Sequence, residues 1–172
     1  VSAVRVRTIL AECDPKTTLI IQSSKSGGTI EPTLVMKAVR TILAETLPEE
    51  EIPSHLIAIT DPGSELEARA KEEGWAKVFS GEPTVGGRYS ALSVFGLVPA
   101  ALVGIDIKKV MESARNAEEL CSADDLDNPA SNLAAFLFDN YKNGRDKFSF
   151  FTPKRGRVLG LWIEQLVAES LG

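Results

Sequence analysis

Three short apolar segments of strand length follow one another in the first half of the chain. They are residues 17–23 (TTLIIQS), 55–60 (HLIAIT) and 76–80 (AKVFS). In residues 17–23 the apolar character is continuous rather than alternating, which is typical of strands buried on both faces of a parallel sheet. Helical patterns fill the intervals, and such strand–helix–strand repeats form right-handed crossovers. The sequence therefore predicts an α/β fold, a parallel sheet with helices on both faces.

The rest of the chain is predicted to be mainly helical, with one more strand. The expected helices are residues 2–12, 30–47, 65–74, 88–104 (bent near Pro99), 106–121, 129–143 and 156–168. The fourth expected strand is residues 147–152 (KFSFFT). The chain would then open on a helix, whereas an α/β domain more naturally opens on a strand. We therefore expect a piece of a larger protein whose first strand is missing.

Charge and scarce residue types exclude several function classes. The net charge of -5 argues against nucleic acid as the main partner, because phosphate backbones need basic faces. His55 is the one histidine, and Cys13 and Cys121 lie far apart, so we expect no metal site, no disulfide framework and a reduced, cytoplasmic protein. The longest uncharged run, residues 89–105, is short for a membrane span and contains glycine and proline.

A Ser/Gly loop directly follows the first strand and opens a helix. A helix N-terminus at the carboxyl edge of a parallel sheet favours a phosphate group, and glycines let the backbone approach it closely. Neither the Walker pattern nor G-x-G-x-x-G is present, so a single terminal phosphate fits better than a nucleotide. The alternative is an ordinary turn with a threonine N-cap. The residues concerned are Ser24, Lys25, Ser26, Gly27, Gly28 and Thr29.

Two further positions could carry chemistry. Arg88 follows two glycines after the third strand, and its permanent charge could stabilise an anionic intermediate. The alternative is an arginine paired with an acidic group of the fold. Glu169 lies at the end of the last expected helix, where a carboxylate is disfavoured. The alternative there is simple exposure. His55 starts a strand after a turn and is interpreted as a strand-edge residue.

The two loops together resemble the signatures of glucose-6-phosphate isomerases. Residues 24–31 (SKSGGTIE) are similar to S-K-S/T-x-x-T-x-E, and residues 85–97 are similar to V-G-G-R-Y/F-S-x-x-S/T-x-x-G-L. Glu169-Ser170 resembles the segment that carries the family's catalytic glutamate, although Ala168 replaces the usual glycine. The resemblance covers essentially the whole chain and is strongest to bacterial forms, including those fused to a transaldolase.

The resemblance implies a fold, a reaction and residue roles. The fold is a three-layer sugar isomerase (SIS) domain, and the reaction interconverts glucose 6-phosphate and fructose 6-phosphate in glycolysis and gluconeogenesis, without metal or cofactor, in a homodimer. Ser24, Ser26 and Thr29, with the Lys25 backbone, would hold the sugar phosphate. Gly87 and Arg88 would face the reacting carbons, with Arg88 steadying the enediolate, and Glu169 would shuttle the proton between C2 and C1.

The chain also departs from the family pattern. The family's first G-G-S-type phosphate loop would precede residue 1, and its histidine and C-terminal lysine would follow residue 172; His55 matches neither role. Residues 1–172 are therefore expected to be most of the first SIS domain, truncated at both ends and inactive alone. The alternative is a non-catalytic SIS module that binds a phosphosugar, but such a sensor would not need Arg88. A purely structural domain would explain neither loop.

Overall fold

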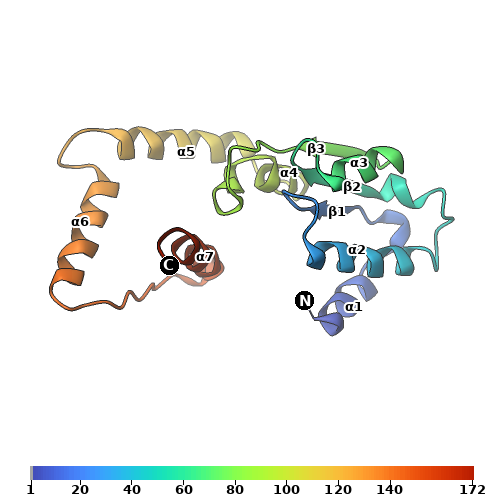
Figure 1. Cartoon of the computed structure of the whole chain (residues 1–172), viewed down its shortest axis with the longest axis horizontal. Helices are drawn as coiled ribbons and strands as arrows, with labels where there is room; N and C mark the ends of the chain where they lie inside the picture. The colour runs from blue at the N-terminus through green and yellow to red at the C-terminus, as the bar shows by residue number, and fades with distance from the viewer. Residues whose placement is uncertain (1) are drawn as a thin grey trace. The chain divides into compact units, whose positions relative to one another are not determined.

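A three-stranded parallel sheet organises the first half of the chain. The computed structural model describes residues 2–172 and divides into two units, one ending at Pro99 and one running from Ala100 to Gly172 (Figure 1). The strands are β1 (Ile20–Ser23), β2 (Leu56–Thr60) and β3 (Lys77–Ser80), in the order β1-β2-β3. The three strands predicted in this part of the chain and their parallel pairing are thus confirmed.

The sheet is flanked by the helices that connect its strands. α2 (Ile30–Leu43) joins β1 to β2, and α3 (Glu65–Glu72) joins β2 to β3. All five residues of β2 are buried, because it is the central strand. Apolar side chains of both helices, β2 and the connecting segments form one core: Met36, Val39, Leu43, Leu47, Ile52, Leu56, Ala58, Leu66, Ala70 and Trp75. This core fixes the strand ends from which the site loops leave.

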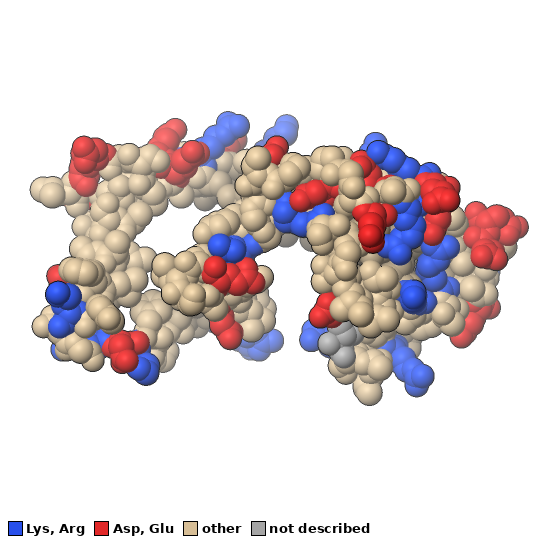
Figure 2. Space-filling model, viewed as in Figure 1, with Lys and Arg blue, Asp and Glu red and all other residues tan. Residues whose placement is uncertain are grey.

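Helix α1 (Ala3–Ala11) precedes the sheet and contacts α2. Ser2 is its N-cap, with a side chain that accepts from Arg5 N at 3.4 Å. Short 3₁₀ helices, Pro15–Thr17 and Ile52–His55, lead into β1 and β2. Acidic and basic side chains are interspersed on the face of this unit seen in Figure 2.

The predicted continuous helix over residues 88–104 is wrong. The segment forms a 3₁₀ helix, Gly87–Leu92, followed by α4 (Val94–Leu102), which contains Pro99. Ser93 separates them: its backbone is extended, and its Oγ accepts from Phe95 N at 3.3 Å, as a helix-capping serine does. A capping serine inside the apolar run therefore divides this segment into two helices.

The second unit is helical throughout its regular structure. It contains α5 (Ile107–Ser122), α6 (Pro129–Lys142), a 3₁₀ turn (Lys154–Gly156) and α7 (Leu159–Leu171). None of its α-helices carries a buried residue among those described. Within residues 2–172, no helix is both long and apolar enough to span a membrane.

The fourth predicted strand, residues 147–152, is wrong. This segment has no regular structure, and Phe148, Phe150 and Phe151 are 57%, 47% and 93% exposed. Alternating aromatic residues favour a strand only where a neighbouring strand pairs with them and a core covers one face. The second unit offers no strand among its described residues, so the sheet has three strands rather than four.

Candidate functional site

The three loops that follow the strands are joined at the carboxyl edge of the sheet. Backbone hydrogen bonds continue the strand pairing one step beyond the strands themselves. They run from Ser24 N to Ile59 O (3.0 Å), from Asp61 N to Lys25 O (3.0 Å) and from Gly81 N to Thr60 O (2.7 Å). Ligands of open α/β sheets bind at this edge. At this edge the predicted phosphate loop therefore lies close to the start of the segment that leads from β3 to Arg88.

The loop over residues 24–29 is compact and polar. Ser24 Oγ donates to Thr29 Oγ1 at 3.4 Å, and Gly28 N donates to Ser26 Oγ at 3.3 Å. Thr29 is the N-cap residue of α2, but its side chain makes no capping hydrogen bond. The alternative of a threonine N-cap is therefore met by position but without a side-chain capping hydrogen bond. The loop leads directly into a 14-residue helix, whose N-terminus favours an anion.

Gly27 holds this loop against α3. Its φ of +72° is a left-handed conformation that L side chains rarely adopt. A Cβ at this position would lie 2.7 Å from Leu66 N and 3.0 Å from Leu66 Cβ, and Leu66 is fully buried. Glycine is therefore required both by the backbone conformation and by the closeness of α3.

Lys25 does not direct its ammonium toward the loop hydroxyls. Its Nζ lies 2.8 Å from Asp61 Oδ1 and 3.0 Å from the carbonyl oxygen of Glu82. The same Nζ is 5.2 Å from the ring centroid of Phe95. The structure thus engages this ammonium with the loops after β2 and β3.

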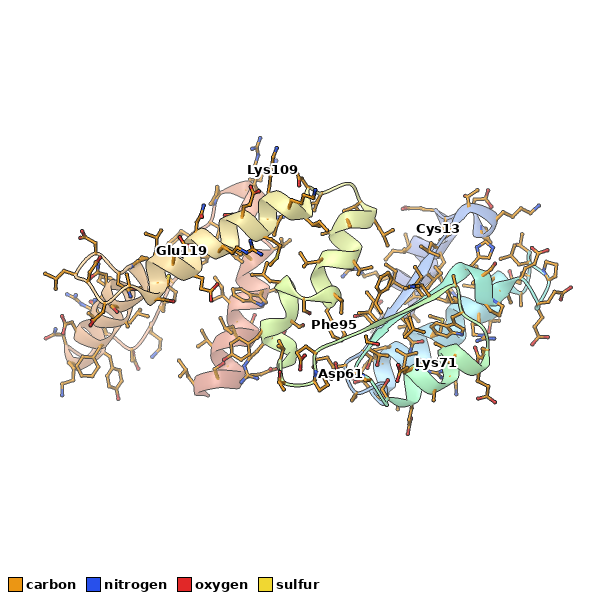
Figure 3. All side chains as sticks on the ribbon, turned by 90° about the horizontal axis from the view of Figure 1, so that it is seen from above. Cys13, Asp61, Lys71, Phe95, Lys109 and Glu119 are labelled. Atoms are coloured by element: carbon orange, nitrogen blue, oxygen red, sulfur yellow. The ribbon has the colours of Figure 1, made fainter. Side chains whose placement is uncertain are left out.

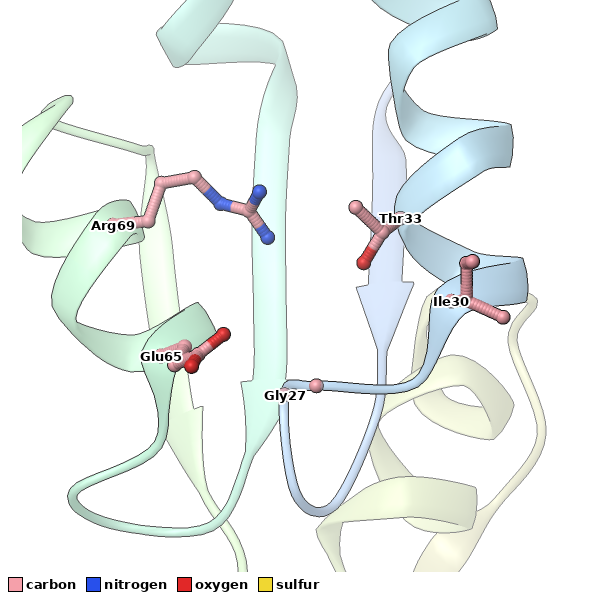
Figure 4. Close-up of a pocket in the computed structure, with 6 residues that line it drawn as sticks. Gly27, Ile30, Thr33, Glu65 and Arg69 are labelled. Carbon is pink, nitrogen blue, oxygen red and sulfur yellow. The ribbon is translucent and has the colours of Figure 1, made fainter.

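A pocket of about 430 Å³ lies beside the glycines of the loop, between α2 and α3 (Figure 4). Thr33 lines it and donates from Oγ1 to Thr29 O at 3.0 Å. Arg69 also lines it, and its buried Nε makes no hydrogen bond within residues 2–172. Sequence reasoning missed Arg69, because only the packing of α3 against the loop brings its positive charge to this side.

Arg88 lies in the 3₁₀ helix Gly87–Leu92, for which Gly86 is the N-cap. Its guanidinium carbon is 4.9 Å from the ring centroid of Tyr89, and Ser90 Oγ donates to Gly87 O at 2.6 Å. These contacts within the turn help to hold its shape. Gly87 and Arg88 belong to the same unit as the phosphate loop.

Glu169 belongs to the second unit and lies in the last turn of α7. The helix continues to Leu171, a little beyond its predicted end. Gln165 Nε2, one turn earlier, donates to Glu169 Oε1 at 3.1 Å.

The structure also describes the histidine and both cysteines of the chain. His55 Nδ1 lies 3.0 Å from the Thr18 carbonyl oxygen, before the amino end of β2, which fits a strand-edge residue. Cys13 and Cys121 are both free thiols. Among residues 2–172, no group of three or more histidine, cysteine or acidic side chains could hold a metal ion.

Comparison with known families gives one consistent match. A family model described as phosphoglucose isomerase matches residues 1–152. Glucose-6-phosphate isomerase of Synechococcus sp. (strain JA-2-3B'a(2-13)) is 42% identical over 159 residues, which are 90% of this chain and 29% of that protein. A probable glucose-6-phosphate isomerase of Methanococcus maripaludis is 34% identical over 171 residues, 98% of this chain and 38% of that protein.

A solved structure extends the likeness to the fold. A hypothetical protein of Thermus thermophilus matches with a TM-score of 0.75 and 34% identity, over 81% of this chain and 34% of that one. The chain thus spans about a third or less of the length of several of the proteins it matches, such as 29% and 30% of two cyanobacterial relatives.

Proposed function

This chain belongs to the phosphoglucose isomerase family, and from that premise we propose that it forms the central part of a glucose-6-phosphate isomerase. The parent enzyme interconverts glucose 6-phosphate and fructose 6-phosphate. This chain supplies most of the first SIS domain, including the phosphate loop, the arginine and the glutamate base. The observation that supports this most strongly is the joining, at one sheet edge, of the phosphate loop to residues 81 and 82, which lead to Gly87 and Arg88.

The substrate phosphate binds in the loop over residues 24–29. The hydroxyls of Ser24, Ser26 and Thr29 and the Lys25 backbone N–H donate to its oxygens, and the N-terminus of α2 favours its negative charge. Arg69 lies beside the loop in the same pocket as Glu65, which partly offsets its positive charge. A chain with a net charge of -5 can therefore bind an anion locally.

The reaction moves one proton between neighbouring carbons. In the open-chain sugar the Glu169 carboxylate takes the proton from C2, and the electron pair of that bond forms a C1–C2 double bond, leaving negative charge on O1. The Arg88 guanidinium stabilises this enediolate. O1 gains a proton, O2 loses one, and Glu169 returns its proton to C1. A single carboxylate suffices on one face of a cis-enediol.

An isomerase assay on the parent enzyme tests this assignment. Glucose 6-phosphate in D₂O should exchange deuterium at the carbon that Glu169 protonates, as fructose 6-phosphate forms. Glu169→Gln should lower kcat by about a hundredfold or more, the range of general-base catalysis, with KM changed only a few-fold.

The matched control is Glu164→Gln, because Glu164 is an exposed carboxylate on the same helix. It should leave kcat within about twofold, as exposed surface substitutions usually do. Equal rates for the two variants would remove Glu169 from the mechanism. Binding of glucose 6-phosphate without any conversion by the parent would instead assign a phosphosugar-binding module.

A further inference from the structure

The Lys25 side chain connects all three loops at the carboxyl edge of the sheet. Starting from the proposed isomerase function, we propose that Lys25 is a positioning residue. Its ammonium holds the turn over residues 81–86 so that Gly87 and Arg88 are presented to the phosphate loop, and it does not itself contact the phosphate.

Lys25 is tied at both its backbone and its side chain. Its carbonyl oxygen accepts from Asp61 N at 3.0 Å and from Thr60 Oγ1 at 3.2 Å. Its Nζ reaches Asp61 Oδ1 at 2.8 Å and Glu82 O at 3.0 Å. Lys25 is therefore bonded twice to Asp61 of the second loop, once to Thr60 at the end of β2 and once to Glu82 of the third loop.

The Glu82 carbonyl is the point through which Lys25 acts on the third loop. The same oxygen accepts from Val85 N at 3.1 Å, which closes the turn immediately before Gly86. The Glu82 carboxylate accepts from Thr84 N at 3.1 Å and from Thr84 Oγ1 at 2.8 Å. The hydrogen bonds from Thr84 hold the pKa of Glu82 below its ordinary value, so the Glu82 carboxylate stays ionised near neutral pH.

The side chains of Asp61 and Phe95 lie close to the Lys25 ammonium. Asp61 and Phe95, labelled in Figure 3, both approach Gly81. A Cβ on Gly81 would lie 2.5 Å from Asp61 Oδ1 and 2.6 Å from Phe95, so a larger residue there would displace these side chains from the Lys25 ammonium. The Lys25 and Asp61 side chains are 21% and 19% exposed. Reduced solvent access strengthens their attraction compared with an exposed surface pair.

These contacts make it unfavourable for the Lys25 ammonium to bind the phosphate. The Asp61 carboxylate neutralises its charge, and the Asp61 and Glu82 oxygens take two of its three N–H donors. Turning the ammonium away from Asp61 toward a phosphate would leave a half-buried carboxylate uncompensated, which is costly.

The test compares Lys25→Met, Asp61→Asn and the double variant. Exchange of the Val85 amide with solvent, measured by NMR on the 172-residue chain, should speed up by about tenfold or more in each, the factor expected for losing a hydrogen bond to a charged group. The Gly81 amide, bonded to Thr60 O, serves as the internal reference. The double variant should be no worse than either single one, because both remove the same interaction.

Ligand affinity and turnover complete the test. Calorimetry with inorganic phosphate should give dissociation constants within about threefold of wild type for Lys25→Met and Asp61→Asn, as expected when no phosphate contact is lost, while kcat of the parent falls about tenfold or more. Loss of phosphate affinity in Lys25→Met alone would overturn the proposal, as would unchanged Val85 exchange. Asp61→Asn is nearly isosteric and carries the test if Lys25→Met does not fold.

These readouts also separate this proposal from the proposed function. A wild-type parent without isomerase activity would refute the function, and the Val85 exchange and the double-variant comparison would still decide the role of Lys25.

Discussion

Replacing Gly27 by alanine tests how the phosphate loop is built. Gly27 has a φ of +72°, and an added Cβ would meet the backbone of Leu66 at 2.7 Å. Gly63 is a matched control on a neighbouring loop. It has a φ of +77°, but a Cβ there would find nothing within 4 Å. The pair separates the cost of the backbone conformation from the cost of the contact.

The losses in the free energy of unfolding of the two variants should differ only by the cost of the contact with Leu66. A left-handed backbone costs a non-glycine residue about 1–2 kcal/mol. The smaller unfolded-state entropy of alanine offsets about 0.4–1 kcal/mol of this, equally at both positions. Gly63→Ala should therefore lower the free energy of unfolding by about 1 kcal/mol, the difference of those two terms. Gly27→Ala should lose about 1–3 kcal/mol more, because fully buried Leu66 cannot move aside.

Equilibrium urea unfolding of both variants and wild type measures these differences. The midpoints should shift with unchanged slopes, which indicates a change of stability alone. Gly27→Ala should also weaken binding of inorganic phosphate, since relieving the contact displaces the loop. A Gly27→Ala variant no less stable than Gly63→Ala would refute the close packing of this loop against α3.

Two further predictions concern the loop and the pH dependence of stability. Replacing Ser26 and Thr29 together by alanine should weaken glucose 6-phosphate binding by about 1–3 kcal/mol, and equal affinity in calorimetry would exclude the loop as the phosphate site. Burial acts to raise the pKa of Glu73, but hydrogen bonds from Trp75 and Arg40 outweigh it and hold the pKa below its ordinary value. The resulting stabilisation is present above the unfolded pKa of about 4.3 and is lost as pH falls through the folded pKa. The urea midpoint of wild type should therefore fall more steeply with acid than that of Glu73→Gln, and parallel curves would contradict the assignment.

The strands could be predicted where burial alone determines them. Residues 55–60 are continuously apolar, and β2 is buried along its whole length. Residues 147–152 carry an equally strong local pattern, yet they form no strand. A strand also needs a neighbour to pair with, and this requirement is set by the tertiary structure rather than by the local sequence.

The site loops could be predicted, but their contacts could not. The phosphate loop and the Gly-Gly-Arg turn are visible as motifs because glycine and hydroxyl residues are clustered in the sequence. The ion pair of Lys25 with Asp61 joins residues 36 positions apart, and Arg69 reaches its pocket from the middle of α3. Such contacts depend on strand register and helix packing, which a single sequence does not reveal.

The central strand β2 accepts backbone hydrogen bonds from both the first and the third loop. Ile59 O receives the first loop, and the next carbonyl, Thr60 O, receives the third. A shift of β2 by one residue would displace both loops together and turn its side chains to the opposite faces. Insertions and deletions are therefore tolerated far less within residues 56–60 than in the solvent-exposed turn over residues 48–51, and the register of this one strand sets the positions at which the first and third loops begin.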